Sequence, residues 1–249
     1  MIKKSKQKNI FITGGSRGIG LSMVKKFAEK GDKVYFTYLK SKKSYFKKIG
    51  ILSKQNIIPI KCDMTKLSSI NKLKKILGKE KKIDVLVNNV GDVVRRSSFL
   101  QSTDRLWQDT LNLNLLSAVR TTKIMVRKLL KSDNPVVINI SSIASKVGGS
   151  GDSLHYGVSK SGINTFTSGL AREFKKFSFH IRVVAIAPSI VDTDFQKKYS
   201  SKKRLKRLIS ETPMGRIGTP QEIAELVYFI SSSKVSFLSG ETIFVGGGR

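Results

Sequence analysis

Tyr156 and Lys160 stand four residues apart in the run HYGVSKSG (155–162), at the start of a predicted helix. Side chains at this spacing lie on one side of a helix, so the phenol and the ammonium can approach each other. A nearby positive charge favours the phenolate and lowers the pKa of tyrosine from its ordinary value of about 10. The pair therefore suits a proton donor, although the same spacing also occurs in ordinary surface contacts.

Short apolar strands alternate with amphipathic helices along the whole chain. The alternation predicts an α/β fold in three layers, with a seven-stranded, mainly parallel sheet covered by helices on both faces. No linker or repeat interrupts residues 1–249, which are expected to form one domain. Ligands of such sheets bind beyond the carboxyl ends of the strands. Strands are expected over 9–13, 33–38, 57–61, 84–89, 135–141, 180–188 and 241–245, and helices over roughly 18–30, 42–54, 66–78, 103–130, 155–176 and 220–231.

The run TGGSRGIG (13–20) follows the first strand and opens the first helix. Gly14, Gly18 and Gly20 allow a tight turn and a close approach of the backbone to a phosphate. The helix N-terminus adds free N–H donors and a positive dipole. A glycine pattern alone can simply mark a turn, but between a first strand and a first helix it predicts a dinucleotide-binding loop.

Composition narrows the classes of protein to consider. The formal net charge is +30, which attracts nucleic acid, anionic lipid or acidic proteins. The lysines are scattered, however, and no nucleic-acid motif is present, so a solvated lysine-rich surface is the simpler interpretation; the alternative is that the charge attracts an acidic partner carrying the substrate. One cysteine (Cys62) and two histidines (His155 and His180) predict no intrachain disulfide and no metal site. Without a secretory signal or a membrane span, a cytoplasmic enzyme is expected.

Seven motifs in order along the chain resemble those of the short-chain dehydrogenase/reductase family, over essentially its whole length. Within the family the chain is most similar to bacterial 3-oxoacyl-[acyl carrier protein] (β-ketoacyl) reductases, through SRGIG, YGVSKSG, LARE (170–173), GRIGTPQEIA (215–224) and FLSGETIFVGGG (237–248). The resemblance implies a doubly wound Rossmann fold. The seven motifs are TGGSRGIG (13–20), CDM (62–64), NNVG (88–91), LNLNLL (111–116), NISS (139–142), YGVSK (156–160) and APSIVDTD (187–194).

The resemblance also implies roles for four catalytic residues. Tyr156 would protonate a carbonyl oxygen as hydride arrives, and Lys160 would lower the pKa of the tyrosine and hold the nicotinamide ribose. Ser142 would polarise the carbonyl, and Asn114 would hold a water that links Lys160 to solvent. Each residue also has a plain structural interpretation, since Ser142 could cap a turn and Asn114 could be a satisfied buried amide.

The cofactor implied is NADP(H). NAD-dependent members usually carry an acidic residue at the end of the second strand, but FTYLKSKK (36–43) has none. Arg17 and Lys40, with Lys42, would instead attract a 2′-phosphate. Asp63 would accept a hydrogen bond from the adenine amino group. Asn89 and Gly91 would border the adenosine ribose. The carboxamide of the nicotinamide would contact Val191 and Thr193. The full set of expected cofactor contacts is Gly14, Ser16, Arg17, Gly18, Ile19, Gly20, Tyr38, Lys40, Asp63, Met64, Asn89, Val90, Gly91, Tyr156, Lys160, Pro188, Val191 and Thr193.

Two departures from the family pattern bear on substrate fit. Val90 replaces the usual alanine and would crowd the cofactor side. Ser189 replaces a glycine that can adopt positive φ, so the loop after the sixth strand would follow a different path. The polar, basic segment 189–212 would form a substrate lid, and an ordinary surface loop with a short helix is the alternative.

The expected function is NADPH-dependent reduction of a 3-oxoacyl thioester on acyl carrier protein, in fatty-acid synthesis or a related polyene or polyketide pathway. The alternatives are the same chemistry on a free ketone, sugar or alcohol, and a non-catalytic NADP(H)- or nucleic-acid-binding module. Basic residues of the run 197–207, with Arg127, Lys128 and Arg172, would dock the acidic carrier. A homotetramer or dimer would pair the helices at 103–130 and 155–176 and the C-terminal strands.

Overall fold

The structure, a computed structural model, describes residues 7–41, 45–46, 50 and 55–249. Its centre is one seven-stranded sheet in the order β3-β2-β1-β4-β5-β6-β7, in which every neighbouring pair is parallel. The strand order reverses between β1 and β4, and ligands of such sheets bind at this reversal. The strands are β1 Asn9–Ile12, β2 Lys33–Tyr38, β3 Ile57–Lys61, β4 Val85–Asn88, β5 Val136–Ile140, β6 Arg182–Pro188 and β7 Thr242–Val245.

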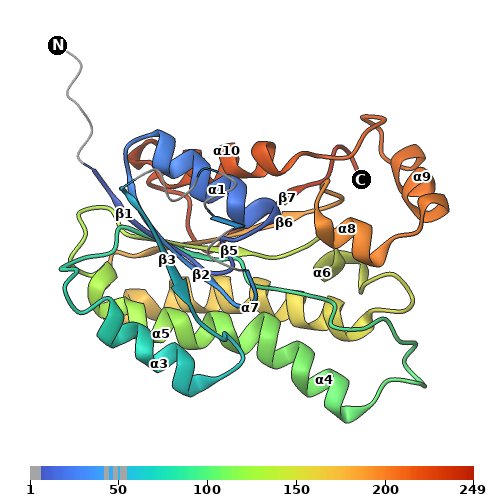
Figure 1. The fold of residues 1–249 in the computed structure, drawn as a ribbon, viewed down its shortest axis with the longest axis horizontal. Coiled ribbons are helices and arrows are strands. Elements are labelled where there is room, and N and C mark those ends of the chain that lie inside the picture. Colours follow the sequence, from blue (N-terminus) through green and yellow to red (C-terminus); the bar gives the residue numbers. More distant parts are fainter. Residues whose placement is uncertain (1–6, 42–44, 47–49, 51–54) are drawn as a thin grey trace.

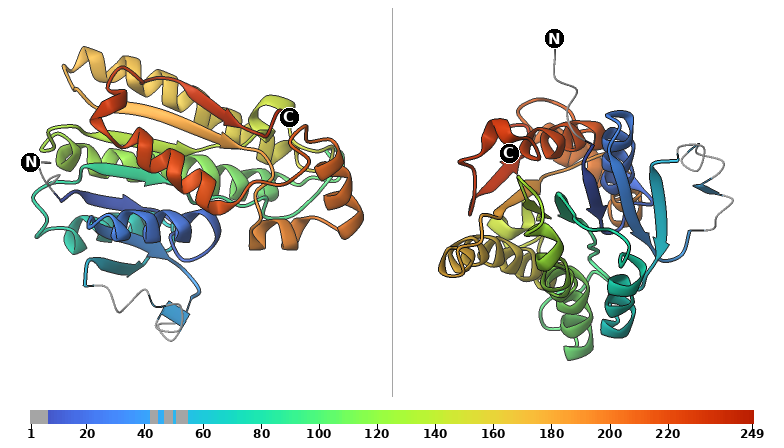
Figure 2. Two further views of the ribbon diagram at one scale, coloured as in Figure 1. Left: turned by 90° about the horizontal axis from the view of Figure 1, so that it is seen from above. Right: turned by 90° about the vertical axis from the view of Figure 1, so that its left-hand side faces the viewer.

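Helices cover both faces of the sheet, which confirms the predicted three layers. Helices α1 and α10 pack together on one face, and α3, α4, α5 and α7 cover the other (Figure 1). Helices α8 and α9 gather with α6 at one end of the molecule (Figures 1 and 2). The elements are α1 Gly18–Glu29, α3 Leu67–Ile76, α4 Asp104–Leu111, η1 Asn112–Leu116, α5 Ser117–Leu129, α6 Ala144–Val147, α7 Leu154–Lys176, α8 Asp194–Tyr199, α9 Lys202–Ser210, α10 Pro220–Ile230 and η2 Ser233–Val235.

Alternate side chains of the central strands enter two separate cores. Ile10 and Ile12 of β1 pack with Phe27 of α1 in the core under α1 and α10. Phe11, between them, packs with Met125 of α5 in the core on the other face. All three strand residues have no exposed surface, as expected for a parallel sheet covered on both sides.

Two predicted elements differ from the structure, and a third lies largely outside the described residues. The long helix expected over 103–130 is divided into α4, the π-helical turn η1 and α5. The helix expected over 42–54 falls largely outside the described residues. The segment 189–212 contains two helices, α8 and α9, and is not a simple loop. Among the described residues, no helix combines the length and apolar character that crossing a bilayer requires.

Candidate active site

A cleft of about 1090 Å³ opens where the strands end. All the side chains predicted to contact the cofactor line it, as do three of the four predicted catalytic residues, Ser142, Tyr156 and Lys160. Asn114 does not line the cleft; it is buried behind Gly91. The topology therefore gathers residues from seven separate segments of the chain into one site.

The glycine loop is held by contacts that leave no room for side chains. A Cβ atom on Gly20 would lie 2.2 Å from the carbonyl oxygen of Gly14, which itself has a φ of +68°. The Nδ2 of Asn89 donates to the carbonyl oxygens of Thr13 at 2.9 Å and Gly14 at 3.1 Å. The Thr37 hydroxyl accepts from the Gly14 N–H at 3.0 Å. Asn89 thus holds the loop itself, a role that the sequence did not predict.

The helix that follows this loop begins without a side-chain cap, because Arg17 at its N-cap forms no capping hydrogen bond. Free N–H donors at an uncapped N-terminus beside a glycine cradle fit a phosphate group. Arg17 and Lys40 are both exposed on the cleft lining. Asp63 also lines the cleft, and one of its oxygens accepts from the Thr65 backbone N–H and hydroxyl. The donors of this region suit a dinucleotide with an additional phosphate.

The hydroxyls of Ser142 and Tyr156 both line the cleft and lie near enough to interact. Ser142 follows β5, and its Oγ also accepts from the Ala144 N–H at 3.1 Å, so it caps a turn as well. Burial raises the pKa of Tyr156 to about 12, while the hydrogen bond from Ser142 opposes this rise. The tyrosine is therefore a neutral phenol near pH 7.

Lys160 is buried, and its Nζ donates to the carbonyl oxygen of Ile140 at 2.8 Å. The Nζ lies 5.8 Å from the centre of the Tyr156 ring. Burial lowers the pKa of the lysine to about 8. Burial is the largest influence on the pKa of Tyr156, and the expected lowering of that pKa by Lys160 stays a prediction.

Asn114 occupies the π-helical turn and meets the loop after β4. Its Nδ2 donates to the carbonyl oxygens of Thr110 at 3.0 Å and Asp92 at 2.9 Å, and its Oδ1 accepts from the Asp92 N–H at 2.9 Å. A Cβ atom on Gly91 would lie 2.8 Å from both Asn114 Oδ1 and Lys160 Nζ. The two polar groups therefore face the same small space beside Gly91.

Comparison with known proteins identifies the family. A family model described as enoyl-(acyl carrier protein) reductase matches residues 14–249. The 3-oxoacyl-[acyl-carrier-protein] reductase FabG of Chlamydia pneumoniae is 32% identical over 97% of this chain and 96% of its own length. The chain belongs to the short-chain dehydrogenase/reductase family. It is an oxidoreductase acting on ketone or hydroxyl groups, and its family binds nicotinamide cofactors.

Further relatives of this short-chain dehydrogenase/reductase cover nearly the whole chain. FabG of Escherichia coli (strain K12) is 31% identical over 95% of each protein. The ligand-free aldohexose dehydrogenase of Thermoplasma acidophilum superposes with a TM-score of 0.84 at 26% identity, covering 98% of this chain and 94% of its own. The crystal structure of gox2181 gives a TM-score of 0.88 at 26% identity, covering 98% and 95%. These matches confirm the predicted family and the doubly wound fold.

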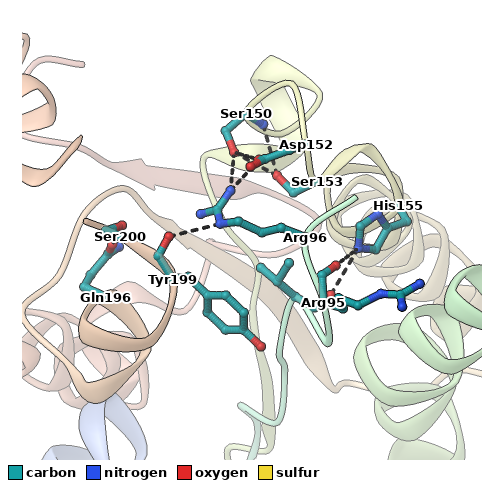
Figure 3. Close-up of polar contacts among 10 residues, drawn as sticks. Arg95, Arg96, Ser150, Asp152, Ser153, His155, Gln196, Tyr199 and Ser200 are labelled. Carbon is teal, nitrogen blue, oxygen red and sulfur yellow. Dashed lines mark hydrogen bonds and ion pairs between the residues drawn. The ribbon is translucent and has the colours of Figure 1, made fainter. Parts of the chain in front are cut away.

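In this short-chain dehydrogenase/reductase, side-chain contacts fasten helix α8 to the loop after β4 (Figure 3). The Tyr199 hydroxyl donates to Asp92 and, at 3.2 Å, to the carbonyl oxygen of Val94. Lys198 Nζ donates to Asp92 at 3.0 Å. Arg96 Nε donates to the carbonyl oxygen of Tyr199 at 3.0 Å. Tyr199, Lys198 and the Val94 N–H hold the pKa of the Asp92 carboxyl below its usual range despite burial, which keeps Asp92 ionised.

Arg96, in the loop after β4, also contacts the loop before α7. Its Nη1 donates to Ser150 Oγ at 3.0 Å and to Asp152 Oδ1, as Figure 3 shows. Beneath it, the buried His155 places Nε2 at 3.1 Å and 3.0 Å from the carbonyl oxygens of Val93 and Arg95. No local motif marks these contacts in the sequence, because the partners lie 54 to 103 residues apart.

The structure bears on three further expectations, which concern Ser189, Val90 and the basic residues expected to dock the carrier. Ser189 does not adopt positive φ, and its buried hydroxyl has no partner among the described residues; the different path expected for its loop stays a prediction. Val90 packs closely against the glycine loop, since a Cβ on Gly14 would lie 2.9 Å from its Cγ2; the crowding expected on the cofactor side stays a prediction.

The basic residues Arg127, Lys128 and Arg172 do not line the cleft. Lys128 lies near the start of β4, at the end of the strands opposite the cleft. Its carbonyl oxygen accepts from the Ile83 N–H, and its Nζ donates to the Glu80 carbonyl oxygen at 2.6 Å. Arg127 adjoins it, and Arg172 lies in the last two turns of α7. These three residues lie away from the cleft of their own chain, and their part in docking an acidic carrier stays a prediction.

Proposed function

We propose that this protein reduces a 3-oxoacyl thioester, carried on acyl carrier protein, to the 3-hydroxyacyl thioester with NADPH. The observation that carries the proposal is that the hydroxyls of Ser142 and Tyr156 line the same cleft as the glycine loop. Two converging O–H groups suit a carbonyl oxygen that gains negative charge during reduction. The names of the relatives favour the thioester over other carbonyl compounds.

The chain's own residues supply the proton and the electrostatic support. A bound nicotinamide cofactor supplies hydride to the carbonyl carbon. Tyr156 transfers its phenolic proton to the carbonyl oxygen, so the C=O bond becomes CH–OH and the phenol becomes a phenolate. The Ser142 Oγ accepts from the Ala144 N–H, so its own hydrogen can turn from Tyr156 to the same carbonyl oxygen when substrate binds. The raised pKa of Tyr156 supports the role of acid, because the phenol carries its proton at neutral pH.

Lys160 and Asn114 support recovery of the proton. The ammonium of Lys160 stabilises the phenolate that follows proton transfer, and a pKa of about 8 allows it to pass a proton on near neutral pH. Asn114 Oδ1 and Lys160 Nζ face one small space beside Gly91, which suits a bridging water. The roles expected of these two residues from the sequence are compatible with this arrangement.

The preference for NADPH rests on charge. Arg17 and Lys40 are exposed on the lining beside the end of β2, where no acidic residue stands. A guanidinium pairs well with a 2′-phosphate, and an NAD-type site would need a carboxylate here instead. Exposed apolar residues on α5, on α7 and near the C-terminus support the proposed oligomer, and the cytoplasmic location stays a prediction. These residues are Leu130, Leu154, Val158, Phe237 and Phe244.

The decisive experiment measures NADPH oxidation with an acetoacetyl thioester and identifies 3-hydroxybutyryl thioester as product. Replacing Tyr156 by Phe should lower kcat by about 10²- to 10⁴-fold without lowering Tm, because only the proton donor is lost. Full activity of this variant, or no turnover by the wild-type protein, would reject the proposal.

A second candidate is oxidation of a sugar, favoured by the fold match to an aldohexose dehydrogenase. Parallel assays offer the protein an aldohexose, a crotonyl thioester as an enoyl substrate, and the acetoacetyl thioester. Turnover of either of the first two in preference to the acetoacetyl thioester would assign a different substrate. Salt-sensitive DNA binding with no turnover of any substrate would instead favour the non-catalytic module.

A further inference from the structure

Four arginines line one end of the cleft, on elements separate from the glycine loop. They are Arg96, Arg204, Arg207 and Arg249. Arg204 and Arg207 belong to α9, and Arg249 is the C-terminal residue, which Figure 1 shows at the same end of the molecule as α8 and α9. Arg17 and Lys40, the cations proposed for the cofactor, come from the β1–α1 loop and the end of β2.

Carboxylates neutralise only part of this cluster. Glu211 is shared by two arginines, because its Oε2 accepts from Arg249 Nη2 at 2.9 Å and its Oε1 lies 3.5 Å from Arg207 Nε. Arg96 is paired with Asp152 (Figure 3). These pairs set two carboxylates against four guanidinium groups.

Arg204 is the member of the cluster whose Nε has no hydrogen-bond acceptor in the part of the chain that the structure describes. This Nε is also buried. Burial and the neighbouring cations Arg96, Arg207 and Arg249 lower its pKa, while Asp152 alone raises it. A buried, unpaired guanidinium N–H is unfavourable unless an acceptor arrives, so the site is suited to an anion.

We propose that Arg204, supported by Arg207 and Arg249, binds a phosphate ester on the tail of the substrate where that tail leaves the cleft. The inference rests on the proposed function, because acyl groups on carrier protein and on coenzyme A both hang from a phosphopantetheine arm. Guanidinium groups bind phosphate through paired, charge-assisted hydrogen bonds, which explains why arginines gather here in a chain whose other cations are mostly lysines.

The test compares two substrates that differ only in this phosphate, acetoacetyl-4′-phosphopantetheine and acetoacetyl-pantetheine, at saturating NADPH. The wild-type protein should favour the phosphorylated substrate by about tenfold or more in kcat/KM, mainly through KM. Arg204→Gln should remove this preference and leave kcat/KM for acetoacetyl-pantetheine and KM for NADPH within about twofold of wild type.

Lys203→Gln is the matched control, because it removes one positive charge from the exposed, neighbouring position of the same helix, outside the cleft lining. It should keep the preference for phosphate. If Arg204→Gln fails to fold, Arg207→Gln tests the same cluster. Calorimetric titration with 4′-phosphopantetheine and with pantetheine gives a readout independent of turnover, and only the phosphorylated ligand should show binding that depends on Arg204.

Equal kcat/KM for the two substrates, or a preference that survives in Arg204→Gln, would overturn the inference while leaving the proposed reduction intact. Binding of 4′-phosphopantetheine through Arg204 without turnover of either thioester would support the phosphate site and reject the proposed reduction. Acetoacetyl-coenzyme A and acetoacetyl-carrier protein identify the source of the phosphate, since loss of Arg204 should weaken whichever of them uses the site.

Discussion

The two walls of the cleft are built from different interactions. The wall formed by residues 13–20 is held by backbone groups, by glycines that admit no Cβ, and by the short side chains of Thr37 and Asn89. The wall formed by α8 and α9 is held by side chains, chiefly the contacts of Tyr199 and Arg96 with loops elsewhere in the chain. The first wall has its shape fixed by packing, and the second depends on charge and hydroxyl contacts.

This difference suits the two occupants that the walls are proposed to face. A dinucleotide presents the same phosphates in every cycle, so a rigid, preformed cradle favours its binding. A substrate on a long arm must enter and leave, which requires a wall that separates at modest cost. Asp92 connects the two demands, because its side chain binds the lid while its backbone binds Asn114. Movement of the α8–α9 segment, the expected substrate lid, would therefore reach the group proposed to relay protons.

The largest effect is expected from a methyl group added to the rigid wall. Gly20→Ala would place a Cβ 2.2 Å from a backbone oxygen, which cannot move aside as a flexible side chain would. We expect a loss of about 1–3 kcal/mol in the free energy of unfolding from overpacking. Binding of NADPH should weaken by about tenfold or more, because the displaced amides no longer fit its phosphates. Chemical denaturation and fluorescence titration measure the two effects.

Gly169→Ala is the control for this substitution. Gly169 lies in α7 with no atom within 4 Å of the position of its Cβ, so alanine should stabilise the protein by about 0.5–1 kcal/mol through helix propensity. If the two variants were equally stable and bound NADPH equally well, the glycine wall would not be the tightly packed cradle described above.

The rigid wall could be predicted from the sequence and the lid only in part. The glycine loop, the strands and the position of Tyr156 follow local patterns, in which neighbours in sequence are neighbours in space. The partners of Asp92, Arg96 and Arg249 lie 38 to 107 residues away, and no periodicity marks them. The basic run 197–207 drew attention to the lid by its charge, but charge alone could not separate Arg204, which faces the cleft, from Lys203, which does not.

Two features of the active site itself were also not predicted from the sequence. The π-helical turn at Asn112–Leu116 has the apolar spacing of an ordinary helix, so 103–130 was expected to be continuous. The pKa of Tyr156 depends on burial, which the pairing with Lys160 does not reveal. Sequence spacing indicates which groups can meet, whereas solvation decides which of them is charged.

An intermediate effect is expected in the lid. Tyr199→Phe removes the hydroxyl that binds Asp92 and Val94, and hydrogen bonds to charged groups contribute about 1.5–3 kcal/mol when buried, less at this half-buried site. Hydrogen exchange should quicken at residues 194–210 and stay unchanged at 14–21. KM for the thioester should rise by roughly fivefold, corresponding to about 1 kcal/mol.

Tyr228→Phe serves as the control, because Tyr228 lies in α10 outside the cleft lining. It should alter exchange in neither wall. Faster exchange at 14–21 in Tyr199→Phe would show that the two walls move as one unit, and the comparison between them would then fail. Unchanged exchange at 194–210 would show that packing, and not the hydroxyl, holds the lid.

The smallest effect concerns strain in the loop that anchors the lid. Val94 has a φ of +67°, a conformation that β-branched residues rarely adopt and that costs about 1–3 kcal/mol. Val94→Gly relieves this strain, but glycine also loses about 0.5–1 kcal/mol of backbone entropy on folding. We expect a net gain in unfolding free energy of about 0.5 kcal/mol, together with faster exchange in the lid, because the carbonyl that accepts from Tyr199 is less firmly placed. The neighbouring Val93→Gly, at a buried position without positive φ, should instead destabilise the protein by about 2 kcal/mol or more. Equal destabilisation by both substitutions would mean that the Val94 side chain is needed for packing and that its unusual backbone conformation stores no strain for opening the lid.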